Sequence, residues 1–416
     1  MKKKELYIFN EISRAAVYGI GSYVDQLIKA LKDTEWKINI VNLYVQGNEI
    51  EIIEKDKYRQ INIPFPSNNH YNAKQYYPMV ITSLLKDIIP DDKKVEYIFH
   101  MNFMSNNNLV KCLKKHFRCK VILVTHYSDW SFSLLGNVHK LKNLLQKPMK
   151  ALADISGEKI VAGFNEDIKM INSVDYWVCV ARHTLETYYK ISKICVKKAT
   201  IIHNALEDIH TPLSNSEKLQ LREKYYLKEN VKIILFAGRL DEIKGITYLI
   251  QAFKMVLATN PDTRLFIAGD GNFNLLLKES ADCWTKIYFT GLINKKQLNE
   301  FYNIADLGIV CSLYEEFGLV AIEMMMHALP IIVSQTGGLD EIVEDGISGL
   351  KVPIRTIKGK RQVDIKRLAE NIQFLLNNPV DAQKLGENGR KRFLDKFELS
   401  IFKEKMMELY ESLCNQ

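Results

Sequence analysis

The chain lacks any long apolar run. Within its 416 residues, no segment approaches the roughly 18 apolar residues that a membrane-spanning helix needs. Residues 1–5 are basic, but the apolar segment that follows, residues 6–9, is too short to form the core of a secretory signal. We therefore expect a cytoplasmic protein that is not integral to a membrane. Peripheral contact with the inner membrane face stays open.

Cysteines are few and solitary. The odd number and the absence of a Cys-x-x-Cys pair argue against a disulfide framework or a zinc ribbon. The sequence also shows no nucleic-acid-binding motif and no cluster of metal-ligating residues. We therefore expect no bound metal and no nucleic-acid partner. The seven cysteines stand at positions 112, 119, 179, 195, 283, 311 and 414.

The composition is that of an ordinary globular chain. The length suggests two domains, and a hydrophobic content of 47% is enough for two cores. The formal net charge of +8 suits an anionic nucleotide-sugar, an acidic membrane surface or a nucleic acid, and does not choose between them.

Strand-like and helix-like segments alternate through the first half of the chain. Such alternation indicates a parallel sheet with helices on both faces. Residues 49–78 are irregular, and we expect loop and variable strand there. A loop over residues 10–21 should precede an amphipathic helix over residues 22–31. The expected strands cover residues 6–9, 37–43, 95–100, 119–125, 174–180 and 200–203.

The expected first loop carries Gly19-Ile20-Gly21. Glycines between a first strand and a first helix let backbone N–H groups approach a phosphate. The third glycine and the acidic residue of the dinucleotide fingerprint are missing. On these residues alone, a plain tight turn explains the pattern equally well.

A histidine ends the expected strand over residues 119–125. Ligands of open α/β sheets bind outside the carboxyl ends of strands, so His126 is a candidate active-site residue. His100 ends the preceding strand in a similar way. A histidine satisfied by backbone carbonyls is the competing interpretation.

Basic residues follow the first strand of the second half. An apolar strand over residues 231–237 runs into Gly238-Arg239 and Lys244-Gly245, and a helix is expected over residues 246–258. Cations stabilise the charge that develops on a departing nucleoside diphosphate. Arg239 offers two parallel hydrogen bonds to such a group, and Lys244 offers a point charge beside a helix start. A solvated βα loop is the alternative.

Two glutamates flank a further strand-turn-helix segment. A strand is expected over residues 307–311 and a helix over residues 319–329, so Glu315 lies on the turn and Glu323 inside the helix. Carboxylates at the end of a strand accept hydrogen bonds from sugar hydroxyls, and the helix start between them attracts a phosphate. The competing interpretation is an acidic helix start with a solvated glutamate.

This segment resembles the Glu-x7-Glu motif of retaining GT-B glycosyltransferases of the group 1 type. Phe317-Gly318-Leu319 makes the match more specific, and residues 238–245 resemble the diphosphate-binding segment Gly-Arg-Leu-x3-Lys-Gly. The resemblance implies two doubly wound, Rossmann-like parallel-sheet domains that face each other across a cleft. Residues 1–208 would bind the acceptor, with a C-terminal helix in residues 397–416 crossing back to them. Residues 209–396 would bind the nucleotide-sugar.

The resemblance also implies a reaction. A sugar would pass from a UDP- or GDP-sugar to an acceptor hydroxyl with retention of anomeric configuration, without metal and with no cofactor apart from the donor substrate. Catalytic roles would fall to four side chains: His126, Glu315, Arg239 and Lys244. Donor binding would involve Gly19, Gly21, Gly238, Leu292, Phe317, Gly318, Leu319 and Glu323.

Several alternatives stay open at this point. A nucleotide-sugar epimerase shares this architecture, and a non-catalytic nucleotide-sugar-binding partner subunit would keep the donor site. The acceptor could be a saccharide, a lipid-linked saccharide, a small molecule or a peptide. A basic and apolar segment over residues 136–150 could lie on a membrane surface or shape the acceptor pocket.

Overall fold

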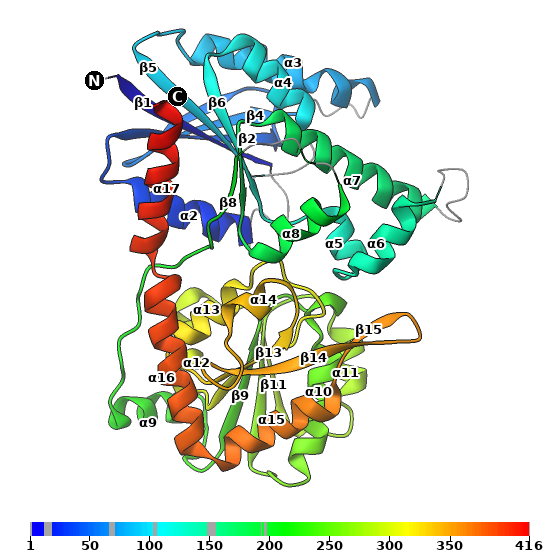
Figure 1. Ribbon diagram of the computed structural model, residues 1–416. Helices are drawn as coiled ribbons and strands as arrows, with labels where there is room; N and C mark the ends of the chain where they lie inside the picture. Colours follow the sequence, from blue (N-terminus) through cyan, green and yellow to red (C-terminus); the bar gives the residue numbers. More distant parts are fainter. Residues whose placement is uncertain are drawn as a thin grey trace. The chain divides into compact units, whose positions relative to one another are not determined.

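The computed structural model divides into two compact α/β units. The N-terminal unit comprises Met1–Ala205 with Leu399–Gln416, and the C-terminal unit comprises Leu206–Glu398. The structure describes residues 2–11, 19–65, 71–102, 106–147, 155–192, 194 and 198–415. Each unit contains one sheet, in which parallel pairs predominate, with helices packed against it (Figure 1).

The N-terminal unit is built on an eight-stranded sheet in the order β3-β4-β2-β1-β5-β6-β7-β8. All neighbouring pairs are parallel except β3 with β4. Strands covered on both faces need continuous apolar runs, and residues 6–9 of β1 are fully buried accordingly. The strands are β1 (Lys3–Glu11), β2 (Trp36–Val45), β3 (Glu51–Glu54), β4 (Arg59–Pro64), β5 (Val95–Met101), β6 (Cys119–Thr125), β7 (Tyr176–Cys179) and β8 (Ala199–Ile201).

Helices cover both faces of this sheet. Figure 1 shows α3, α4 and α7 on one side and α2 with α17 on the other. Although α17 ends the chain, it packs on α2, where Phe402 meets Tyr23 edge to face at 5.6 Å. The helices are α2 (Gly19–Leu31), α3 (Tyr71–Ile88), α4 (Asn107–His116), α5 (Asp129–Ser133), α6 (Val138–Leu145), α7 (Ile155–Ser173), α8 (Arg182–Ile191) and α17 (Leu399–Cys414).

The C-terminal unit contains a seven-stranded sheet in the order β11-β10-β9-β12-β13-β14-β15. Its neighbouring strands run parallel, except that β14 and β15 form an antiparallel hairpin. The strands are β9 (Lys232–Ala237), β10 (Thr263–Ala268), β11 (Ile287–Gly291), β12 (Leu307–Val310), β13 (Ile331–Gln335), β14 (Leu350–Ile357) and β15 (Lys360–Val363).

The helices of the C-terminal unit follow its strands in alternation. They are α9 (Asn215–Lys224), α10 (Ile246–Leu257), α11 (Phe273–Glu279), α12 (Lys295–Ile304), α13 (Leu319–Met326), α14 (Gly337–Ile342), α15 (Ile365–Asn377) and α16 (Pro379–Lys396). Two short 3₁₀ helices, η2 (Glu242–Lys244) and η3 (Trp284–Lys286), lie in loops.

The strand order reverses at one place in each sheet. In the N-terminal unit β1 lies between β2 and β5, and in the C-terminal unit β9 lies between β10 and β12. Connections leave such a point in opposite directions, which opens a crevice at the carboxyl ends of the two strands. Ligand sites are therefore expected after β1 and β5, and after β9 and β12.

Three expectations about local structure are wrong. Gly19 and Gly21 lie in the first turn of α2, not in a loop, because the buried side chains of Ile20 and Tyr23 extend the apolar face of the helix. In the segment over residues 49–78, β3 and β4 fit the expected variable strand, but residues 71–78 begin α3 instead of forming loop or strand. The helix after Gly318 ends at Met326, because Ala328 takes a left-handed φ of 53°.

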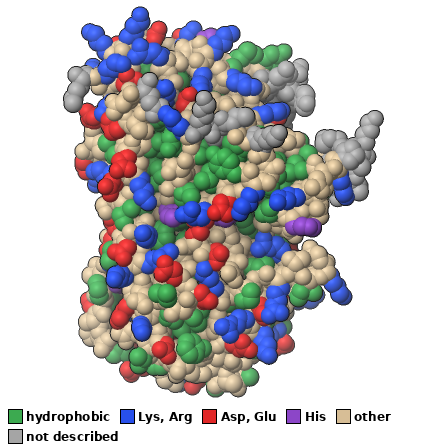
Figure 2. All heavy atoms as spheres, viewed as in Figure 1, with side chains coloured by type: hydrophobic (Ala, Val, Ile, Leu, Met, Phe, Trp, Pro, Cys, Tyr) green, Lys and Arg blue, Asp and Glu red, His purple; other side chains and the backbone are tan. Residues whose placement is uncertain are grey.

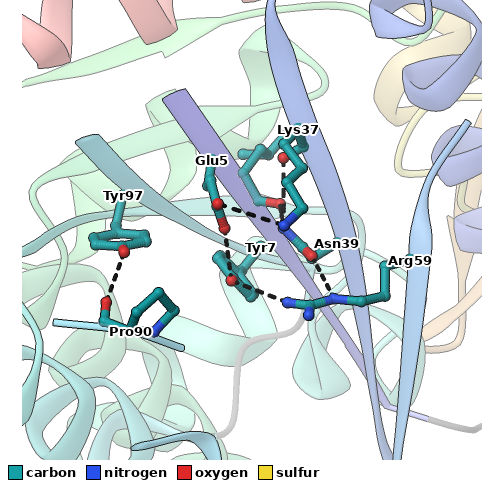
Figure 3. Close-up of polar contacts among 8 residues, drawn as sticks. Glu5, Tyr7, Lys37, Asn39, Arg59, Pro90 and Tyr97 are labelled. Carbon is teal, nitrogen blue, oxygen red and sulfur yellow. Dashed lines mark hydrogen bonds and ion pairs between the residues drawn. The ribbon is translucent and has the colours of Figure 1, made fainter. Parts of the chain in front are cut away.

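A polar network lies at the amino ends of the strands of the N-terminal sheet (Figure 3). Tyr7 donates its hydroxyl hydrogen to Glu5 at 2.8 Å, and both side chains are buried. Arg59 donates to Asn39 Oδ1 at 2.9 Å and to the Tyr7 hydroxyl oxygen at 3.3 Å. Burial, followed by the charge of Glu5, raises the pKa of Tyr7 above its ordinary value. Lys37 approaches Glu5 only loosely, at 3.6 Å.

No described helix is both long enough and apolar enough to cross a membrane. Figure 2 shows acidic and basic side chains interspersed on the face that it draws.

We predict that Arg59→Leu destabilises the N-terminal unit by about 1–3 kcal/mol, because the substitution leaves the buried Asn39 Oδ1 without its donor. Lys37→Ala is the matched control and should change stability by less than about 1 kcal/mol, since its ion pair is loose and exposed. Urea unfolding followed by tryptophan fluorescence measures both changes, because three of the four tryptophans, Trp36, Trp130 and Trp177, lie in this unit. Equal midpoints for the two variants would contradict the network's role.

Candidate functional site

Backbone hydrogen bonds join the loops at the carboxyl edge of the C-terminal sheet. Gly269 N–H donates to Gly291 O at 3.0 Å, and Gly238 N–H donates to Ala268 O at 2.9 Å. Further along, Leu313 N–H donates to Ile243 O at 2.7 Å and Gly338 N–H to Glu315 O at 3.0 Å. These bonds connect the loops after β11, β10, β9, β12 and β13 in the order of the strands. The edge therefore forms one continuous backbone surface.

Glycines permit this close approach. A Cβ atom on Gly245 would lie 2.1 Å from Cys311 O, and one on Gly269 would lie 1.8 Å from Gly238 O. A Cβ atom on Gly337 would lie 1.9 Å from Glu315 O. All three residues also have positive φ, between 49° and 150°, which disfavours any L side chain. These three glycines thus allow loop to pack directly against loop.

Lys244 and Glu315 form an ion pair across two of these loops. Their side chains are only 20% and 16% exposed. Ser312 donates its hydroxyl hydrogen to the same Glu315 oxygen at 2.9 Å, which fixes the carboxylate. The pair lies at the β9/β12 reversal of the sheet, where a ligand is expected. A ligand with an anionic group and hydroxyl groups could take the place of this ion pair. Its anionic group would bind Lys244, and its hydroxyl groups would donate hydrogen bonds to Glu315.

Arg239 lies on the same loop as Lys244 but does not contact it. Its guanidinium pairs with Asp241 at 3.0 Å, and its side chain is 38% exposed. The structure therefore brings Lys244 and Glu315 together and leaves Arg239 as a half-exposed cation held by a neighbouring carboxylate.

Gly318 begins α13 without a side-chain cap. Its φ of 118° turns the chain into the helix, and the first N–H groups of α13, beginning at Leu319, have no acceptor within the helix. Phe317 is buried and packs edge to face on Phe397 at 5.9 Å. Phe317 therefore anchors the turn through its ring, and its backbone rather than its side chain is the part suited to a ligand.

Glu323 lies one turn into α13, separate from the Lys244–Glu315 pair. It accepts a hydrogen bond from the hydroxyl of Tyr302 at 2.7 Å. Desolvation raises the pKa of Glu323 above its ordinary value, although the hydrogen bond from Tyr302 opposes that shift. The carboxyl thus lies where ionisation is unfavourable, unlike that of a solvated helix residue.

The remaining C-terminal positions from the sequence lie at the ends of strands. Gly238 follows β9 with a φ of 146°, and Leu292 follows β11 with its side chain 70% exposed. Leu292 stands next to Gly291, which belongs to the chain of linked loops.

In the N-terminal unit, His126 directly follows β6, as the sequence predicts. Its Nε2 lies 3.1 Å from Asn102 Oδ1, and its ring meets that of Tyr23 edge to face at 4.4 Å. His100 is completely buried, and its Nε2 lies 3.0 Å from the same Asn102 oxygen. Desolvation lowers the pKa of His126 to about 3 and that of His100 to about 4. Both rings are therefore neutral near pH 7.

Sequence reasoning missed two residues at the β1/β5 reversal of the sheet. Asn102, just after β5, joins the two histidines. Glu11 ends β1, and burial together with the charge of Asp129 raises the pKa of Glu11 to about 7. Each residue lies two positions beyond the end of a predicted strand, residues 6–9 for Glu11 and 95–100 for Asn102, and that proximity was the available signal.

Gly19 and Gly21 lie in the first turn of α2 and not in a loop, while residues 12–18 of the expected loop lie outside the described residues. In the described part of the chain, no group of three or more His, Cys, Asp or Glu side chains is arranged to hold a metal ion.

Comparison with known families matches part of the C-terminal unit. Residues 217–392 match the model of the family described as "Glycosyl transferases group 1". That span contains Arg239, Lys244, Glu315 and Glu323.

Curated relatives include several transferases. The chain is 29% identical over 245 residues to an uncharacterized glycosyltransferase of Methanocaldococcus jannaschii, covering 55% of this chain and 62% of that protein. It is 34% identical over 199 residues to the lipopolysaccharide 1,2-N-acetylglucosaminetransferase of Salmonella typhimurium, covering 42% of this chain and 52% of that protein. A match to the N-acetyl-alpha-D-glucosaminyl L-malate synthase of Bacillus anthracis is weaker, at 21% identity, but covers 88% of this chain and 89% of that protein. The chain thus spans about half to three fifths of the length of the first two of these relatives.

Solved structures resemble the whole chain. Sucrose-phosphate synthase from Thermosynechococcus elongatus aligns with a TM-score of 0.76 at 22% identity, covering 99% of both chains. The HepE protein of Anabaena, solved in complex with UDP and glucose, aligns with a TM-score of 0.72 at 14% identity, covering 99% of this chain and 100% of that chain. The predicted GT-B fold class is confirmed by these structural neighbours.

We predict that Gly337→Ala disrupts the candidate site more than Gly346→Ala. Both glycines have positive φ, so both substitutions should cost about 1–2 kcal/mol from backbone strain. Only the alanine at position 337 would also meet a backbone atom, which adds about 1–3 kcal/mol or displaces the Glu315 loop. Thermal unfolding and nucleotide-sugar affinity measure the two effects. Equal melting temperatures and equal affinities would show that the loops are not tightly apposed.

Proposed function

We propose that the protein transfers a glycosyl group from a nucleoside diphosphate sugar, a UDP- or GDP-sugar, to an acceptor hydroxyl with retention of configuration and without a metal. The observation that carries this proposal is the Lys244–Glu315 pair at the β9/β12 reversal, within loops joined by backbone hydrogen bonds. A partly buried cation beside a fixed carboxylate suits a ligand with phosphate at one end and sugar hydroxyls at the other.

The comparisons support a nucleotide-sugar donor. HepE, a structural neighbour, has been solved with UDP, with UDP and glucose, and with UDP-glucose. Two curated relatives are named for the transfer or attachment of amino sugars. These descriptions apply to those proteins, and their bearing on this chain rests on the shared family match and on the site.

In the proposed reaction the bond between the anomeric carbon and the diphosphate oxygen breaks, and its electron pair stays on that oxygen. Lys244 and Arg239 stabilise this developing charge. The acceptor hydroxyl oxygen bonds to the anomeric carbon on the same face, and its proton passes to a diphosphate oxygen. No protein nucleophile takes part, so retention follows from front-face attack.

The other residues bind and orient the donor. Glu315 accepts hydrogen bonds from sugar hydroxyls, with the backbone N–H groups of Gly318 and Leu319 directed to sugar and phosphate. Glu323 accepts hydrogen bonds from the ribose hydroxyls. Leu292 and Gly238 line the donor through backbone contacts, and His126 takes part in the transfer as a neutral ring.

We expect Arg239→Ala and Glu315→Ala each to reduce turnover of the donor, the first by weakening stabilisation of the leaving diphosphate and the second by loosening the sugar. Removing one such electrostatic contact typically costs about 100-fold or more in rate. Arg367→Ala and Glu370→Ala, an exposed pair on α15, are the matched controls and should retain activity. The measurement is release of nucleoside diphosphate from a panel of nucleotide-sugars with a broad panel of acceptors.

The possible results separate the rival functions. Donor binding without transfer to any acceptor would favour a non-catalytic binding subunit, and acceptor-independent conversion of the sugar would favour an epimerase. Unchanged turnover in both site variants would refute the proposed site.

We predict that Glu323→Gln increases stability while it weakens donor binding. The folded-state pKa of Glu323 is raised, so ionisation destabilises the folded protein at any pH above that pKa. Glutamine is uncharged and still accepts the hydrogen bond from Tyr302. The gain in melting temperature should be largest near neutral pH and should shrink as the pH falls through the folded-state pKa of Glu323. Melting curves at several pH values and calorimetric titration with the donor test this. A lower melting temperature at neutral pH would contradict it.

A further inference from the structure

A buried hydrogen-bond network holds His126 from behind. Asn102 is 1% exposed, and its Nδ2 donates to Asn10 Oδ1 at 2.9 Å. That contact turns Asn102 Oδ1 toward the two histidines, at 3.0 Å from His100 Nε2 and 3.1 Å from His126 Nε2. A carbonyl oxygen accepts hydrogen bonds and cannot donate them. Both Nε2 atoms therefore carry hydrogen in this arrangement.

The second nitrogen of each ring then differs in its surroundings. His100 Nδ1 lies 2.8 Å from the hydroxyl of Tyr410 on α17, which can donate to it. His126 Nδ1 has no hydrogen-bond partner among the described residues, and the ring is partly exposed. A neutral imidazole with hydrogen on Nε2 presents a bare acceptor at Nδ1. His126, which directly follows β6, thus carries a bare acceptor atom at the carboxyl edge of the sheet.

We propose that Asn102 is a positioning residue that fixes His126 as the Nε2–H tautomer, so that His126 Nδ1 accepts a hydrogen bond from a substrate hydroxyl during transfer. This inference rests on the proposed function, since it supplies the chemistry by which His126 would face a sugar. It excludes a role for His126 as a proton donor or as a cation beside the leaving group. It also gives α17 a part in the site, through Tyr410 and His100.

The titratable groups that face the two rings bring no opposite charge to them. They are the other histidine of the pair, Tyr23 of α2 and Tyr410 of α17. Among the described residues, no carboxylate contributes to the lowered pKa values of the two histidines, which burial dominates. A negative charge at position 102 would change this balance, because it would stabilise the imidazolium form.

This gives a discriminating substitution, Asn102→Asp. An aspartate only accepts hydrogen bonds, so it preserves the Nε2–H tautomer while raising both histidine pKa values. We expect near wild-type kcat/KM at high pH and a new loss of activity as the pH falls, where His126 becomes protonated on both nitrogens. The wild type should show no such limb between pH ~5 and pH ~8, because its His126 has a pKa of about 3.

A substitution that removes the hydrogen-bond acceptor at position 102 tests the role of Asn102 in a second way. Asn102→Leu should lower kcat by about 10- to 100-fold, by analogy with the loss of orienting partners of metal-binding histidines, with a smaller change in KM for the donor. The matched controls are Asn39→Asp and Asn39→Leu. Asn39 is fully buried in the same sheet, and near the amino ends of the strands it accepts a hydrogen bond from Arg59 (Figure 3). These controls should lower the melting temperature without changing the pH profile.

Tautomers are also visible without any substrate. In protein labelled with ¹⁵N-histidine, the ring signals of His126 can be assigned among the nine histidines by comparison with His126→Gln. We expect a protonated Nε2 and an unprotonated Nδ1 at pH 7 in the wild type, and mixed tautomers in Asn102→Leu. This measurement stands even if no donor is found, so failure of the proposed function and failure of this inference are distinguishable.

Three results would overturn the inference. One is a wild-type His126 with hydrogen on Nδ1, which would mean that the Asn102 amide donates to both rings. Another is an Asn102→Asp variant that folds but is inactive at every pH. The third is an Asn102 series whose pH profiles and kcat values follow the Asn39 controls, which would make the network purely structural.

Discussion

The candidate donor site depends on the close apposition of backbone at the carboxyl edge of the C-terminal sheet. Five loops are joined in the order of their strands by N–H to carbonyl contacts, and glycines at 245, 269 and 337 leave no room for a Cβ atom. At these three positions the backbone of one loop lies so close to the next that a side chain would collide with it. The ion pair of Lys244 with Glu315 is a consequence, because it spans two loops that this packing brings together.

Both units place ionisable groups where the charged form is unfavourable. Desolvation raises the pKa of Glu323 and of Glu11, and it lowers those of His126 and His100. These groups lie at or near the carboxyl ends of strands beside the two reversals of strand order. Ionisable groups that are buried without a strong opposite charge lower the stability of the folded protein. Their position at these two edges therefore fits sites arranged for a ligand rather than for stability.

The fold followed from the sequence because its signals are local. Continuous apolar strands alternating with amphipathic helices specify a parallel sheet covered on both faces, and β6 and β12 begin at their predicted residues. The errors arose where local signals are weak. The glycines at 19 and 21 looked like a loop, but burial of Ile20 and Tyr23 against the sheet carries the helix over them. The strands β3 and β4 lie at the sheet edge, where alternation is poor and neighbouring strands decide the structure.

By itself, the sequence placed Arg239, Lys244, Glu315 and His126 in segments that follow expected strands, because continuous apolar runs mark where those strands end. The tertiary structure alone decided which of these residues meet. Lys244 and Glu315 are 71 positions apart and form a pair, whereas Arg239 bonds within its own loop. Asn102 became visible only in three dimensions, since its link to His126 is formed by the adjacency of β5 and β6. Such contacts depend on strand order, and no local pattern of residues encodes that order.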